Sequence, residues 1–175
     1  MNVLGRLGFE NAYAFAVRTE QAEALGLRTM SDLIRHAPTL SIGADYEFFE
    51  RPEWEALTRT YGFAFAEQTT LDPALRYRAV AAGQVDVVAA YTTDGQVAAY
   101  DLTLLSDDRQ AFPPYDAILL VAPALAQDEE ILSALRPYVD AIDTDTMRDA
   151  NKMVDVDGQP VAEAASWIQD HVRTR

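Results

Sequence analysis

The stretch AFPPYDAILLV, residues 111–121, joins two prolines and a tyrosine to an apolar run typical of a buried strand. A proline fixes its own φ angle, gives up a backbone hydrogen-bond donor and restricts the preceding residue to extended conformations. We therefore expect a stiff chain just before the strand begins, with Tyr115 at the end of the stiff piece. The organisation of the chain changes at this stretch, because strands alternate with helices before it and helices dominate after it.

The chain before residue 111 alternates between short apolar runs and helical patterns that begin at a cap or a proline and end at a glycine. The expected caps are Thr19, Ser31 and Asp72. This alternation predicts an α/β fold with a largely parallel sheet. The expected strands are residues 11–18, 40–45, 63–70, 85–95 and 100–108, and the expected helices are residues 19–25, 29–37, 51–62 and 72–83.

The tail after Tyr115 reads as one strand followed by three helices, at residues 128–142, 143–154 and 160–172. The first of these helical patterns gathers its apolar residues on one face. A single strand cannot cover three amphipathic helices. We therefore expect the tail to be part of a lobe whose other strands lie elsewhere.

The composition is that of a globular protein, with 49% hydrophobic and 24% charged residues among 175. The net charge of −14 would repel phosphate backbones, so a nucleic-acid partner is not expected. There is no cysteine, and His36 and His171 lack metal-ligand spacing, so neither a metal nor a cofactor is expected. The first residues do not read as a signal peptide, and no apolar run is long enough to span a bilayer.

Several segments together resemble one family. They are ENAYAFAVR (10–18), DYEFFERPEWEALTRTYG (45–62), DPALRYRAVAAGQVDVVAAYTTDG (72–95), DLTLLSDDRQAFPPYDAILLV (101–121) and NKMVDVDGQPVAEAASWI (151–168). The chain, from about residue 8 to residue 172, is similar to the substrate-binding proteins of ABC importers for glycine betaine, choline and related osmoprotectants. The combination of TDG and FPPY at this separation carries most of the resemblance.

The resemblance implies an α/β clamp of the periplasmic-binding-protein type II fold, with the ligand in the cleft between two lobes and two crossover strands as the hinge. Most of the family's first lobe, which precedes the first crossover, has no counterpart here, so we expect a fragment. One complete lobe would be joined to the C-terminal helices of the other. The implied units are residues 1–17 (first-lobe remnant and first hinge strand), 18–110 (complete α/β lobe), 111–121 (second hinge strand) and 122–175 (C-terminal helical part of the first lobe).

The ligand-binding residues implied by the resemblance are Tyr13, Arg51, Tyr91, Thr92 and Tyr115. A quaternary ammonium ion has a positive charge but no N–H, so the faces of aromatic rings are what can hold it, and three tyrosines would form such a cage. The planar fork of an arginine suits a ligand carboxylate.

Each of these residues also has a plainer interpretation. A tyrosine at the end of a strand is often half-buried packing, and Arg51 can pair with Glu47 or Glu50 instead of a ligand. Thr93 and Asp94 are further candidates for lining the cleft beside Thr92, but Asp94–Gly95 is equally an ordinary turn. The remaining tyrosines are interpreted as structural: Tyr46, Tyr61, Tyr77, Tyr100 and Tyr138.

The implied function is that of a non-enzymatic substrate-binding component of an ABC importer for glycine betaine, choline or carnitine. Its partners would be a small quaternary ammonium ligand and an ABC permease subunit, in a periplasmic or extracellular, membrane-associated parent protein. An effector-sensing domain, or a non-binding domain that forms a homodimer through its exposed first-lobe surface, are the alternatives. Acid–base catalysis by Asp107 and Asp108 or by Glu129 and Glu130 is not expected, because adjacent carboxylates point to different sides and no histidine, cysteine or phosphate loop supports them.

Overall fold

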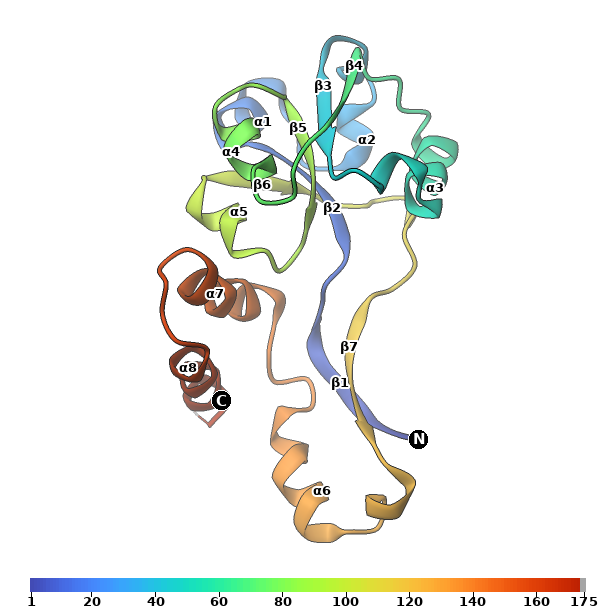
Figure 1. The fold of residues 1–175 in the computed structure, drawn as a ribbon. Coiled ribbons are helices and arrows are strands. Elements are labelled where there is room, and N and C mark those ends of the chain that lie inside the picture. The colour runs from blue at the N-terminus through green and yellow to red at the C-terminus, as the bar shows by residue number, and fades with distance from the viewer. Residues whose placement is uncertain (174–175) are drawn as a thin grey trace.

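The structure, a computed structural model, describes residues 1–173, so the last two residues of the expected 122–175 unit lie outside it. Figure 1 shows an α/β unit from which two long strands run side by side toward the C-terminal helices. These strands are β1 (Asn2–Glu10) and β7 (Asp116–Val121), and they pair antiparallel. The chain therefore enters and leaves the α/β unit through neighbouring segments.

The α/β unit is built on a five-stranded sheet with the order β4-β3-β5-β2-β6. Strand β3 pairs parallel with β4 and with β5, as expected, but β2 runs antiparallel to β5 and to β6. The expectation of a largely parallel sheet misses β2, because β2 follows β1 almost directly rather than a crossover helix. The strands are β2 (Tyr13–Arg18), β3 (Ser41–Ala44), β4 (Glu67–Thr70), β5 (Val87–Tyr91) and β6 (Leu102–Leu105).

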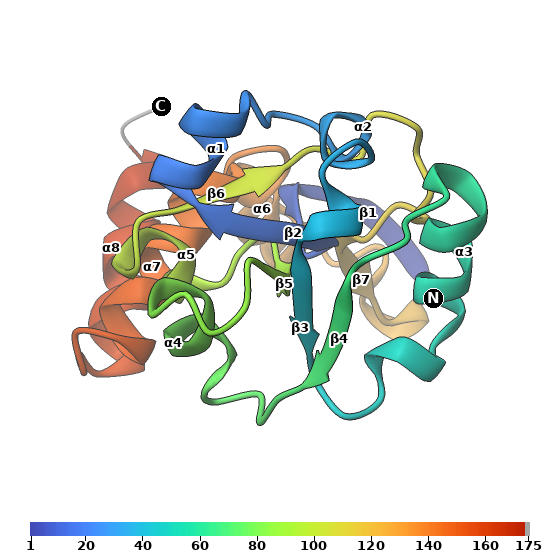
Figure 2. The ribbon, with the colours of Figure 1, turned by 90° about the horizontal axis from the view of Figure 1, so that it is seen from above.

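Helices cover both faces of this sheet, as Figure 2 shows from above. Phe15 and Val17 of β2 face a core with α1 (Thr19–Leu25), α2 (Met30–Leu33) and α3 (Pro52–Tyr61). Ala16 points to the other face, into a second core with α4 (Arg76–Ala81) and α5 (Gly95–Ala99). Successive side chains of β2 thus point into two cores, one on each face of the sheet. Because helices cover both faces, this strand is buried along most of its length.

Helix ends follow the sequence in some places and depart from it in others. Helix α3 begins at Pro52 and is followed by Gly62 in a left-handed conformation, as predicted. Ser31 is not the cap of α2, because the N-cap is Thr29, two residues earlier, which forms a reciprocal capping box with Asp32. Asp72 closes a turn ahead of α4 instead of capping it, and its Oδ1 accepts from the Ala74 amide at 2.8 Å. Thr19 begins α1 without a side-chain cap, since its hydroxyl donates to the Asp101 carbonyl at 2.9 Å.

Strand β1 was not predicted, because none of its side chains is buried and its sequence lacks clear alternation. Its pairing with β7 runs from Asn2 opposite Val121 to Glu10 opposite Asp116. On its other edge, the Asp140 amide donates to the Arg6 carbonyl at 2.9 Å. A two-stranded ladder is marginally stable alone, so β1 depends on these flanking contacts.

The C-terminal helices are α6 (Glu129–Leu135), α7 (Thr144–Asp155) and α8 (Val161–Arg173). Helix α7 packs on α5 and on the turn before it. Arg148 Nε donates to the Thr92 carbonyl at 2.9 Å, and Asn151 Nδ2 donates to the Thr93 carbonyl at 2.8 Å. A Cβ atom at Gly95 would lie 2.4 Å from the Lys152 amide nitrogen, so the absence of a side chain there permits the contact.

Gly95→Ala is expected to lower the free energy of unfolding by about 3 kcal/mol, because the added methyl group meets the α7 backbone, which cannot rotate away. Gly62→Ala is the matched control. Gly62 has a positive φ and open space around it, so its change is expected to cost only about 1 kcal/mol. Chemical denaturation measures both. Two results would contradict the tight α5–α7 contact. One is an equal loss of unfolding free energy in the two variants, and the other is amide exchange in α7 of Gly95→Ala that is no faster than in the unmodified chain.

Candidate functional site

Three tyrosines that the sequence singled out lie together where the two long strands meet the α/β unit. Tyr13 is the first residue of β2 and pairs in register with Tyr91, the last residue of β5. Their ring centroids are 4.7 Å apart, and the Tyr91 hydroxyl donates to the Tyr13 hydroxyl at 3.0 Å. The Tyr115 ring, just before β7, lies edge-on at 6.2 Å from the Tyr13 ring. Residues distant in sequence thus form one aromatic cluster, which we call the tyrosine cluster (Tyr13, Tyr91 and Tyr115).

The Tyr13 ring is the centre of this cluster and is only 7% exposed. It also contacts Phe48 and Phe112, at centroid distances of 5.4 and 5.8 Å. Burial, and then the hydrogen bond with Tyr91, raise the pKa of the Tyr13 phenol above its ordinary value, so this ring stays neutral at physiological pH. The half-buried rings of Tyr91 and Tyr115 provide the accessible part of the cluster.

Tyr115 is held from two directions. Its hydroxyl donates to Glu53 Oε1 in the first turn of α3 at 2.9 Å, and its amide donates to Glu10 Oε2 at 3.3 Å. Burial, and then the hydrogen bond to Glu53, raise the pKa of the Tyr115 phenol. The two prolines directly before it restrict the backbone, and these two hydrogen bonds hold the Tyr115 side chain and amide in place.

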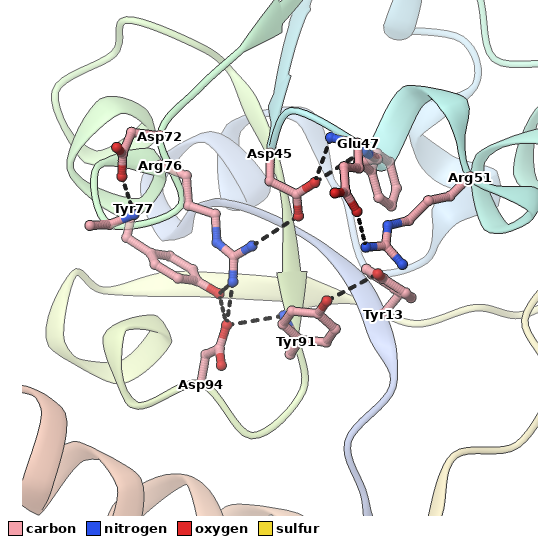
Figure 3. Close-up of polar contacts among 11 residues, drawn as sticks. Tyr13, Asp45, Glu47, Arg51, Asp72, Arg76, Tyr77, Tyr91 and Asp94 are labelled. Atoms are coloured by element: carbon pink, nitrogen blue, oxygen red, sulfur yellow. Dashed lines mark hydrogen bonds and ion pairs between the residues drawn. The ribbon is translucent and has the colours of Figure 1, made fainter.

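Arg51 reaches the edge of the cluster from the residue before α3. Figure 3 shows its guanidinium directed toward Glu47 and Tyr13. Nη2 lies 2.6 Å from Glu47 Oε2, so the pairing with Glu47, an alternative recognised from the sequence, is present. Nε is buried and has no hydrogen-bond partner among the described residues. A buried Nε cannot reach a ligand, but the contact with Glu47 leaves other N–H donors of the guanidinium unused, and a role toward a ligand carboxylate stays a prediction.

Thr92 uses its hydroxyl to fasten the connection between β1 and β2. It accepts from the Ala12 amide at 3.0 Å and donates to the Glu10 carbonyl at 2.7 Å. Next to it, the Thr93 hydroxyl donates to Asn11 Oδ1 at 2.8 Å. The turn after β5 is thus hydrogen-bonded to the connection between β1 and β2, which is the first connection into the α/β unit. The Thr92 hydroxyl has little capacity left for another hydrogen-bond partner.

A buried ionic cluster behind Tyr91 was missed by the sequence reasoning. Arg76, only 7% exposed, places Nη2 2.9 Å from Asp94 Oδ2 and Nη1 3.9 Å from Asp45 Oδ2. Its guanidinium carbon lies 5.3 Å from the centroid of the Tyr91 ring and 4.9 Å from that of Tyr77, within the range of cation–π attraction. The same Asp94 oxygen accepts from the Tyr91 amide at 3.3 Å. The cluster thereby fixes both the backbone and one side of the ring of Tyr91.

A second unpredicted network holds the loop between β6 and β7. The Tyr61 hydroxyl donates to Asp107 Oδ1 and accepts from the Arg109 amide at 2.9 Å. Asp107 Oδ2 accepts from the Phe112 amide at 2.9 Å, which sets Phe112 beside Tyr13. Burial, and then the hydrogen bond to Asp107, raise the pKa of Tyr61. The sequence marked Tyr61 only as structural and gave no sign of this partner.

A hollow of about 770 Å³ lies between β2 and the loop that leads to β7. Tyr13 and Thr92 line it together with Phe112, whereas Arg51, Tyr91 and Tyr115 do not. Two of the five predicted residues therefore line the hollow, and the other three lie outside its lining. Among residues 1–173, no group of three histidine or acidic side chains is placed to hold a metal ion.

The family model described as the substrate-binding domain of ABC-type glycine betaine transport systems matches residues 1–170. The chain is 33% identical over 155 residues to a Helicobacter pylori protein described as ergothioneine transport permease/ergothioneine binding protein EgtU, covering 87% of this chain and 28% of the relative. It is 33% identical over 151 residues to the carnitine transport binding protein OpuCC of Listeria monocytogenes, covering 85% and 49%. A glycine-betaine-binding protein of Pseudomonas aeruginosa is 33% identical over 177 residues, covering 93% and 57%. The chain thus spans only part of the length of these relatives.

Solved structures agree with the expected fold class, an α/β fold of the periplasmic-binding-protein type II kind. A glycine betaine/carnitine/choline ABC transporter structure matches with a TM-score of 0.89 and 34% identity, covering 97% of this chain and 64% of that one. Apo YehZ of Escherichia coli matches with a TM-score of 0.74 and 29% identity, covering 96% and 64%. No helix within residues 1–173 has both the length and the apolarity needed to cross a membrane.

Arg76→Met is expected to lower the free energy of unfolding by about 2–3 kcal/mol, because it leaves Asp94 and Asp45 without their buried cation. Arg59→Met is the matched control, since Arg59 pairs with Glu55 on the exposed side of α3 and is expected to cost less than about 0.5 kcal/mol. Denaturant titrations measure both. A similar small loss in the two variants would contradict a structural role for the ionic cluster.

Tyr61→Phe is expected to cost about 1–2 kcal/mol and to speed amide exchange at Phe112, because Asp107 loses the phenol that holds it in place. Tyr46→Phe changes an exposed ring by the same atom and is expected to leave both quantities unchanged. Hydrogen-exchange NMR separates the outcomes. Unaltered protection at Phe112 would mean that Asp107 holds the loop without help from Tyr61.

Proposed function

Because the chain belongs to the family of substrate-binding domains of ABC-type glycine betaine transport systems, we propose that it binds a quaternary ammonium ligand at the tyrosine cluster. The single observation that carries this proposal is the convergence of Tyr13, Tyr91 and Tyr115, with ring centroids 4.7 and 6.2 Å from the central ring. A methylated ammonium cannot be held by N–H donors of its own, so electron-rich ring faces are its natural partners. Each well-placed ring contributes about 0.5–2 kcal/mol.

Arg51 is the proposed partner for a ligand carboxylate. Relatives of this chain are described as binding or transporting glycine betaine, carnitine and ergothioneine, and each of these compounds carries a trimethylammonium group and a carboxylate. The guanidinium lies at the edge of the cluster, and its contact with Glu47 uses only part of its five N–H donors, which supports this assignment. Thr92 contributes by keeping the first connection in place beside Tyr13.

The two-lobed organisation is part of the same proposal. Residues 18–110 act as one lobe, residues 1–17 and 111–121 supply the hinge strands, and the described part of residues 122–175, which ends at residue 173, contributes helices to the other lobe. The tyrosine cluster comes entirely from the first of these lobes and from the hinge. This chain alone therefore offers one side of a cleft, and we expect a dissociation constant of about 1 mM or weaker.

The proposed role in the cell is delivery of the unmodified ligand to an ABC permease subunit, without catalysis. The domain would work on the periplasmic or extracellular side of the membrane, where a permease takes up its cargo. The acidic net charge of −14 fits the capture of a cation, since it raises the local concentration of positive ligands.

Choline is expected to shift NMR signals at the tyrosine cluster, whereas 3,3-dimethyl-1-butanol, its uncharged carbon isostere, is not. Tyr115→Leu is expected to weaken choline binding about fivefold, the loss of one ring worth about 1 kcal/mol. Tyr46→Leu removes an exposed tyrosine outside the cluster and serves as the control. Equal responses to choline and the isostere, or none to either, would contradict the proposed function.

A further inference from the structure

The Glu47 carboxylate forms an ion pair with the Arg51 guanidinium, which is the proposed partner of the ligand carboxylate. Glu47 precedes the 3₁₀ helix η2 (Phe48–Glu50), and Arg51 follows it, so this short turn brings their side chains together. The Glu47 Oε2 to Arg51 Nη2 distance is 2.6 Å. Glu47 is 75% exposed at the side chain and Arg51 is 40% exposed, so the pair lies at the rim of the cluster rather than within the core.

The other acidic groups around the cluster have different partners. Asp45 accepts from the Glu47 and Phe48 amides and faces Arg76. Glu53 accepts from the Tyr115 hydroxyl. Of these carboxylates, Glu47 is the one that forms an ion pair with Arg51, so the charge that Arg51 presents to a ligand depends on Glu47.

We propose that Glu47 is a specificity-determining residue, which competes with a ligand carboxylate for Arg51 and so reduces the preference for carboxylate-bearing over carboxylate-free quaternary ammonium ions. This inference rests on the proposed function of the same site. The competition is one of charge more than of geometry, because a guanidinium has five N–H donors and Glu47 uses only part of them.

The two kinds of ligand meet the ion pair differently. A carboxylate-free cation, such as tetramethylammonium, meets a guanidinium whose charge Glu47 already neutralises, so the repulsion between two cations is small. A zwitterion such as glycine betaine would gain from an unpaired Arg51 and instead has to share it with Glu47. Removing the Glu47 charge should therefore strengthen the binding of the zwitterion and weaken that of the simple cation.

Helix α3 offers a matched control for this change. Glu55 and Arg59 form an exposed i,i+4 ion pair with an Nη1–Oε1 distance of 3.6 Å, comparable in exposure to Glu47 and outside the aromatic cluster. Glu55→Gln therefore removes the same charge from the same short region of the chain. A general effect of net charge on cation binding would appear equally in both variants.

The experiment titrates the full chain with tetramethylammonium and with glycine betaine, and NMR shift changes give both dissociation constants. In Glu47→Gln we expect the ratio of the two constants to move toward glycine betaine by about fivefold, the size of a partly exposed ion pair. In Glu55→Gln the ratio is expected to equal that of the unmodified chain. In an Arg51→Gln background, Glu47→Gln should leave the ratio unchanged, because its effect acts through Arg51.

The outcomes separate this inference from the function on which it rests. If both probes bind and the Glu47→Gln ratio stays the same, or shifts equally in Glu55→Gln, the inference is overturned and the proposed function stands. If the shift persists without Arg51, Glu47 does not act as a competitor and the inference is overturned as well. If neither probe binds the unmodified chain, the proposed function fails and this inference fails with it.

Discussion

The hydrogen bond from the Asn11 amide to the Tyr115 carbonyl, 3.2 Å long, joins the two connections by which the chain enters and leaves the α/β unit. Tyr13 lies two residues after Asn11 in the first connection, and Tyr115 ends the second connection. The register of β2 with β5 then places Tyr91 opposite Tyr13. This hydrogen bond between the two connections positions the tyrosine cluster, because it brings together rings that are far apart in sequence.

Polar groups around the point where the two connections meet hold these rings in place. Thr92 clasps the first connection, Asp107 holds Phe112 in the second, and the Arg76–Asp94 pair fixes Tyr91 from behind. Each contact satisfies a polar group that would otherwise be costly to bury. The accessible parts of the cluster therefore rest on supported side chains, so the proposed ligand would meet rings that are already in place.

The sequence predicted best where local chemistry dictates the structure. Pro52 and Gly62 bound their helix as expected, because proline and glycine act through their own backbone conformations. Contacts between distant segments were less predictable: β1 has no buried residue to reveal it, and the Arg76–Asp94 pair joins a helix to a turn after the next strand. The tyrosines were found through a family resemblance, since a tyrosine at the end of a strand looks the same whether it binds a ligand or only packs.

The proposed function requires a methylated ammonium to lie against these ring faces. The most direct measurement is the set of nuclear Overhauser contacts between the trimethylammonium protons of glycine betaine and the aromatic protons of the chain. Contacts to the rings of Tyr91 and Tyr115, which are the accessible members of the cluster, are the predicted result. Contacts confined to aromatic rings elsewhere, such as Trp167 on α8, would show that the ligand binds at another place and would contradict the account.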